Sequence, residues 1–150
     1  MMDLVPVTAP DIEELTAFLN AADLTLSGLG SPAVQLWMAR DASGNVLAST
    51  GYESSADGRN VLIRSVAVDA AHKGEGLGLE AARFALGRAR EANAQRAWLF
   101  SRRSGAFWQK LGFVAADRDA LAAALPSTHQ VRLFIETGQL GQESAWSRSL

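Results

Sequence analysis

A glycine-rich turn, His72 to Gly78, stands between a strongly apolar run and a run rich in alanine, leucine, arginine and glutamate. The apolar run "VLIRSVAV" (61–68) predicts a buried strand, and residues 76–93 predict a helix. Such a strand–turn–helix directs backbone N–H groups and the positive end of the helix dipole at one point, which suits a phosphate. Glycines there let a ligand approach the backbone and permit positive φ. The turn therefore predicts a phosphate-binding loop, with a tight turn that binds nothing as the alternative.

Two common phosphate-binding motifs do not match this turn. A Walker loop ends in Gly-Lys-Ser/Thr, and no such ending occurs here. The glycine spacing also differs from the Rossmann fingerprint, and the strands before the turn form a meander instead of a βαβ unit. A phosphate bound here would therefore belong to another class of site.

The whole chain predicts one α+β domain, residues 1–150, built on a mixed sheet. Three runs joined by short turns (34–41, 46–54 and 61–68) form an antiparallel meander on its N-terminal side. The run at 96–101 follows a helical crossover, so it can lie parallel to 61–68. The other expected elements are a strand at 4–7, a helix capped by Thr8, helices at 105–113 and 118–125, and a final strand within 144–150. Residues 128–150 are otherwise the least readable part of the chain.

Composition argues against several classes of function. The net charge of −2 gives no electrostatic reason to expect nucleic acid or a membrane as a partner. The absence of cysteine excludes disulfides and thiolate metal sites and fits a reducing, cytoplasmic location. With only two histidines, far apart in sequence, we expect no metal site. We expect neither a signal peptide nor a membrane span, and the oligomeric state, monomer or homodimer, stays open.

The glycine turn and a second motif together resemble the GNAT family of N-acetyltransferases. The family pattern Gln/Arg-x-x-Gly-x-Gly/Ala corresponds to residues 73–78, "KGEGLG", and its Leu-Gly-Phe signature corresponds to "AFWQKLGF" (106–113). The two motifs stand in the family order, and the resemblance covers nearly the whole chain. It implies a GNAT-like fold in which a central parallel strand pair splays around acetyl-coenzyme A (acetyl-CoA).

The resemblance also implies which residues contact acetyl-CoA. Its pyrophosphate would lie on the backbone amides of residues 74–79, and its pantetheine arm would run along the strand and be covered by the helix with the Leu-Gly-Phe motif. The implied contact residues are Val66, Ala67, Val68, Lys73, Gly74, Glu75, Gly76, Leu77, Gly78, Leu79, Ser104, Phe107 and Trp108. The backbone amide near Val66 would also stabilise the oxyanion.

Two positions depart from the family pattern, and Glu75 is a third unusual residue. Lys73 replaces the usual glutamine or arginine and can face phosphate as a point charge. Trp108 stands where many members have a tyrosine that protonates the departing thiolate, and an indole N–H is too weak an acid for that step. Glu75 would be repelled by pyrophosphate, so we expect it to point to solvent.

The acceptor side has fewer sequence signals. Only a neutral amine attacks a thioester, so a base is needed, and Glu53 in "TGYES" is the candidate. Arg64 interrupts an apolar strand and would hold a substrate carboxylate. Ser65 and Trp37 complete the expected substrate-binding set. The alternatives are a solvated turn residue for Glu53, an outward-facing or ion-paired Arg64, and a core role for Trp37.

A closer likeness exists to a GNAT branch associated with arsenic-resistance operons, carried by residues 51–53 (Gly-Tyr-Glu), 63–65 (Ile-Arg-Ser) and 19–24 ("LNAADL").

The resemblance to the GNAT family predicts an acetyl-CoA-dependent N-acetyltransferase. Its acceptor would be the primary amine of a small, amino-acid-like molecule, which attacks directly in a ternary complex. One alternative is a GNAT-fold module that binds acyl-CoA without catalysis, and another is an unrelated α+β binding protein. His129 receives no role.

Overall fold

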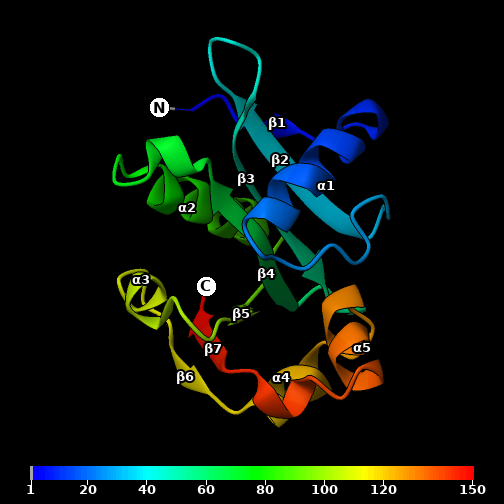
Figure 1. Cartoon of the computed structure of the whole chain (residues 1–150). Coiled ribbons are helices and arrows are strands. Elements are labelled where there is room, and N and C mark those ends of the chain that lie inside the picture. Colours follow the sequence, from blue (N-terminus) through cyan, green and yellow to red (C-terminus); the bar gives the residue numbers. More distant parts are fainter. Residues whose placement is uncertain (1) are drawn as a thin grey trace.

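The predicted meander forms the N-terminal half of a seven-stranded sheet in the computed structural model, which describes residues 2–150 (Figure 1). β2 (Val34–Arg40), β3 (Val46–Ser54) and β4 (Asn60–Val68) pair antiparallel in sequence order. The full strand order is β1-β2-β3-β4-β5-β7-β6. The other strands are β1 (Val5–Pro6), β5 (Arg96–Phe100), β6 (Val114–Ala116) and β7 (Ala145–Ser149).

The helices cover both faces of this sheet. The α-helices are α1 (Ile12–Ala21), α2 (Leu77–Glu91), α3 (Gly105–Gln109), α4 (Arg118–Ala124) and α5 (His129–Glu136), and short 3-10 turns lie at Ala9–Asp11, Ala70–His72 and Leu140–Gln142. The predicted cap at Thr8 is present, because the Asp11 carboxylate accepts hydrogen bonds from the Thr8 amide and hydroxyl. Among residues 2–150, no helix has the length and apolar character that crossing a membrane requires.

Side chains alternate between the two faces along each strand. Trp37 belongs to the core cluster under α2, together with Leu86. The neighbouring residue Leu36 points the other way and packs with Leu15 of α1. Leu62 faces α4 and α5 on that same side of the sheet. The sheet therefore separates a core under α2 and α3 from a core under α1, α4 and α5.

The central parallel pair splays, as expected from the family resemblance. β4 pairs with β5 only from Asn60 to Leu62, opposite residues 96–98. β4 then continues unpaired on this side to Val68. Figure 1 shows α2 and α3 on the two sides of the resulting opening. The predicted fold class, a mixed sheet with an antiparallel meander and one splayed parallel pair, is confirmed.

Two elements were not predicted, and both are short. β6 has three residues, too few for an alternation to show, and it pairs only with β7. α5 occupies the part of the chain with the weakest sequence signals. It buries Val131 and Phe134, three residues apart, over only eight residues. Neither apolar pattern is long enough to distinguish a helix or strand from a loop.

Candidate active site

A cavity of about 550 Å³ lies where β4 leads into α2. The cavity is lined by all but one of the residues that the family resemblance implied for contact with acetyl-CoA. The exception is Glu75, which is exposed. Four residues that the sequence did not suggest line the cavity as well: Ala22, Leu24, His72 and Lys110. The cavity thus joins the glycine turn, the C-terminal half of β4 and α3 around one space.

The glycine turn has the backbone conformation that requires glycine. Gly74 and Gly76 have φ of +88° and +81°, a region that residues with a Cβ rarely adopt. A Cβ at either position would meet nothing within 4 Å, so glycine is required by the backbone conformation and not by crowding. Gly76 precedes α2, and no side chain caps its first turn within the described residues. The first N–H groups of this 15-residue helix are therefore available to an anion at the cavity wall.

The opposite wall is aromatic. Trp108 is 7% exposed, and its ring lies 4.9 Å from that of Phe107 and 5.4 Å from that of Phe113. The single tyrosine of the chain, Tyr52, packs beside Trp37 in the core under α2 and does not line the cavity. Burial raises the pKa of Tyr52. No tyrosine therefore replaces the acid that Trp108 does not supply.

A β-bulge lies between the cavity and the polar residues of β4. Arg64 pairs with Gly51 and Ala67 pairs with Ser49, so Ser65 and Val66 together oppose one residue of β3. Ser65 has φ of +60°. The bulge reverses the alternation, because Ile63 lies in the core under α2 while Ala67, four residues later, lies in the core under α1. A bulge leaves one residue outside the ladder, which frees a backbone amide near Val66.

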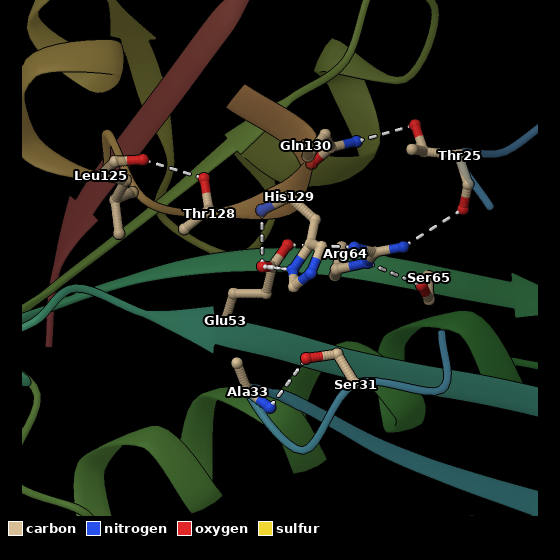
Figure 2. A network of polar contacts seen from close by, with 10 residues as sticks. All are labelled: Thr25, Ser31, Ala33, Glu53, Arg64, Ser65, Leu125, Thr128, His129 and Gln130. Atoms are coloured by element: carbon tan, nitrogen blue, oxygen red, sulfur yellow. Dashed lines mark hydrogen bonds and ion pairs between the residues drawn. The ribbon is translucent and has the colours of Figure 1, made fainter. Parts of the chain in front are cut away.

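Glu53, Arg64 and His129 form a buried polar cluster next to this bulge (Figure 2). The Arg64 guanidinium donates to Glu53 Oε2 at 3.0 Å, and both side chains are at most 2% exposed. Glu53 Oε1 accepts from the backbone N–H of His129 at 2.7 Å and lies 2.9 Å from its Nδ1. Figure 2 shows all three side chains pointing toward one another from β3, β4 and α5.

Arg64 also holds the loop that follows α1. It donates to the Thr25 carbonyl at 3.3 Å and to the Ser65 hydroxyl at 3.2 Å. Burial lowers the pKa of Arg64, and the charge of Glu53 opposes that shift. Because Gln130 of α5 donates to the Thr25 hydroxyl, the loop is fastened to both β4 and α5.

This arrangement corrects two expectations for the acceptor side. The idea that Glu53 is a solvated turn residue is wrong, since the side chain is buried with three hydrogen-bond donors. Arg64 forms an internal ion pair, which was the alternative to a role in substrate binding. Its guanidinium is buried and is not exposed to a substrate carboxylate. The chain neutralises this buried arginine itself, as a buried charge requires.

Trp37 does not belong to this cluster. Its ring lies 5.8 Å from Tyr52 and 5.4 Å from Phe84, with the Arg88 guanidinium 5.6 Å from its centre. All of these contacts are on the α2 face, whereas Glu53 and Arg64 point to the other face. The substrate role expected for Trp37 is therefore replaced by a role in the core.

His129 is the residue that the sequence did not assign. It is the first residue of α5, and its side chain is 30% exposed, far more than its two charged neighbours. The ring lies against Gly28, where an added Cβ would come within 2.5 Å of the imidazole. Within residues 2–150, no hydrogen bond involves its Nε2. Glu53 and His129 are 76 residues apart, so no local motif could have indicated the pair.

Comparisons with known proteins show the family and agree with the fold. The model of the Acetyltransferase (GNAT) family matches residues 8–113. Among solved structures, the fold is similar to that of N-acetylglutamate synthase from Neisseria gonorrhoeae complexed with coenzyme A and N-acetyl-glutamate (TM-score 0.79, 17% identity). That match covers 100% of this chain but 35% of the synthase. No curated protein sequence matches the chain.

Two further solved structures match over almost their full length. An acetyltransferase of the GNAT family from Staphylococcus aureus Mu50 has a TM-score of 0.78 and 16% identity, covering 100% of this chain and 99% of the other. Rv2747 from Mycobacterium tuberculosis, in complex with CoA and NLQ, has a TM-score of 0.76 and 20% identity, covering 99% of each chain. Because the family model covers most of the sequence, the chain belongs to the acetyltransferase (GNAT) family, whose cofactor is acetyl-CoA.

Proposed function

We propose that the chain is an acetyl-CoA-dependent N-acetyltransferase that acts on the primary amine of a small molecule. One observation carries this proposal: a single cavity runs from the left-handed glycines before α2 to the bulge at Val66. A cofactor with a pyrophosphate at one end and a thioester at the other matches those two features.

The cofactor would lie along the cavity in one direction. The free N–H groups at the start of α2 and the Lys73 ammonium suit its pyrophosphate. Ala67, Val68, Phe107 and Trp108 line the cavity and would contact the pantetheine arm, the first two from β4 and the other two from α3. The thioester carbonyl would then lie at the bulge, where the amide near Val66 would stabilise negative charge on its oxygen.

The amine attacks the thioester directly, and its proton passes to a base on the acceptor side. Glu53, the expected base, is buried and accepts three hydrogen bonds. We therefore assign Glu53 to positioning and assign the proton to Nε2 of His129. Glu53 holds Nδ1 of the ring, which leaves Nε2 as the acceptor in the neutral imidazole. Water protonates the CoA thiolate, because Trp108 cannot.

The substrate class is the less constrained part of the proposal. Similar folds include N-acetylglutamate synthase in complex with N-acetyl-glutamate and with L-arginine, which supports an amino-acid-like acceptor. Arg64 would contribute indirectly, by fixing the loop at Thr25. The likeness to the branch associated with arsenic-resistance operons remains a proposal that rests on residues 19–24, 51–53 and 63–65.

Two measurements, made one after the other, test the proposed function. Calorimetric titration with acetyl-CoA tests the cofactor site, and no binding would contradict the assignment and favour an unrelated α+β binding protein. Thiol release from acetyl-CoA is then measured with a panel of small amines weighted towards amino acids. Binding without turnover on any amine would favour the acyl-CoA-binding module that lacks catalysis.

A further inference from the structure

A second cavity, of about 410 Å³, lies between α2, α3 and β7 and has an unusual lining. Four of its seven lining residues are cationic, namely Arg83, Arg90, Lys110 and Arg148, and none is acidic. The chain as a whole has a net charge of −2. We call this space the basic hollow, and it concentrates positive charge that the average composition does not suggest.

The position of the four cations follows from the fold. Arg83 and Arg90 are seven residues apart on α2 and so lie on one side of the helix. Arg148 of β7 donates to the Leu111 carbonyl at 2.6 Å and to the Ser149 carbonyl at 2.9 Å, which fixes its guanidinium beside the turn after α3. Two of its five N–H donors are used in this way, and the others stay available.

The chain does not neutralise these charges itself. Throughout residues 2–150, none of the four cations is within ion-pair distance of a carboxylate. The neighbouring Arg88, on another side of α2, does have such a partner in Glu91. Burial and the charge of Arg90 both lower the pKa of Arg148. An anion in the basic hollow would relieve this mutual repulsion.

We propose that the basic hollow binds a phosphate group. Guanidinium forks match phosphate oxygens, and such charge-assisted hydrogen bonds are stronger than neutral ones. Lys110 lines both the basic hollow and the cofactor cavity, so the two spaces adjoin. The phosphate is therefore either the 3′-phosphate of bound CoA or a separate phosphate ligand. The first source rests on the proposed function, and the second does not.

The test compares CoA with 3′-dephospho-CoA by calorimetry, using the complete chain. The variant is Arg83→Ala with Arg90→Ala, because both side chains are exposed and alanine favours a helix. The matched control is Arg59→Ala with Arg132→Ala, which removes the same charge from exposed positions outside the basic hollow. Thermal unfolding with inorganic phosphate is measured on the same proteins.

If the 3′-phosphate occupies the basic hollow, the original chain prefers CoA by on the order of tenfold. The Arg83/Arg90 variant then loses that preference and the control keeps it. If a separate ligand binds, CoA and 3′-dephospho-CoA bind with equal affinity, and inorganic phosphate raises the melting temperature more in the original chain and the control than in the Arg83/Arg90 variant. The proposal is overturned if neither response depends on Arg83 and Arg90. If the original chain did not bind CoA, the proposed function would be contradicted. The response to inorganic phosphate would then decide whether the basic hollow binds phosphate.

Discussion

The cofactor cavity and the Glu53–Arg64–His129 cluster lie on either side of one β-bulge, yet they are built in different ways. The cavity is lined mainly by glycines and apolar side chains, with Lys73 and Lys110 as its charged members, and most of the lining comes from two continuous segments. The cluster is made from charged side chains brought together from β3, β4 and α5. The cavity is open to a ligand, whereas Glu53 and Arg64 are at most 2% exposed.

This difference indicates which parts of the molecule tolerate substitution. Where backbone and apolar side chains line the cavity, a single change removes or adds a contact without leaving a buried charge, so most changes there should have local effects. A buried ion pair depends on each partner, because removal of one leaves the other charge without compensation. We therefore expect changes in the cluster to affect stability or turnover more strongly than changes in the cavity.

His129→Asn should have the largest effect, a loss of turnover on the order of 10²–10⁴-fold. Asparagine can keep the hydrogen bond from Nδ2 to Glu53 but has no base in place of Nε2. The loss should shrink as pH rises, because more of the amine arrives already neutral. Steady-state rates across pH, with an amine found in the screen, measure this effect.

A companion variant, His129→Ala, checks whether the ring acts chemically. Added imidazole should restore part of its turnover, since the ring position is partly exposed. Acetyl-CoA affinity should be the same in all three proteins. Nearly full activity in His129→Asn would mean that the residue only holds Glu53, and the assignment of the base would be wrong.

Glu53→Ala should cost about 3–5 kcal/mol of unfolding free energy, because Arg64 is left buried and unpaired. Urea unfolding measures this cost. The double variant Glu53→Gln with Arg64→Met should be more stable than Glu53→Gln alone, since it removes both charges. If Glu53→Ala lost less than about 1 kcal/mol, the Glu53–Arg64 ion pair would contribute little to the stability of the fold.

Gly76→Asn should weaken acetyl-CoA binding by roughly tenfold, about 1.4 kcal/mol. Asparagine tolerates a left-handed conformation, and its side chain would enter the space where the pyrophosphate is proposed to lie. The control is Gly44→Asn, in the turn between β2 and β3, with a similar φ of +85° and equally open surroundings. Both variants should have similar stability. Equal affinities in calorimetry would place the pyrophosphate elsewhere.

Trp108→Phe should have the smallest effect, a rise of a few fold in the KM for acetyl-CoA with kcat within about threefold of the original. Phenylalanine keeps an aromatic wall toward the cavity but fills less of the space beside Phe113. Kinetics at saturating acetyl-CoA separate the two parameters. A fall in kcat of several hundredfold would demonstrate a chemical role for the indole.

The sequence predicts these two regions to different extents. The phosphate-binding turn at residues 73–78 can be predicted from the local sequence, because left-handed glycines before a helix depend only on neighbouring residues. Glu53 and Arg64 attract notice as charges in apolar strands, but the sequence does not show that they neutralise each other. His129 contacts Glu53 across 76 residues and starts a helix with little periodicity of its own. Its role follows only from the folded arrangement.

The fastening of the loop after α1 has a consequence for redesign of that loop. Arg64 binds the backbone carbonyl at position 25, and the His129 ring requires a residue without a Cβ at position 28. Leu24 and Leu26, by contrast, are 37% and 36% exposed. A grafted or randomised loop that keeps Gly28 and a hydroxyl at position 25 would vary Leu26 and Leu24, which lines the cofactor cavity, while the ion pair stays intact. Libraries that randomise position 28 would mostly yield inactive chains, whatever acceptor they were designed to accommodate.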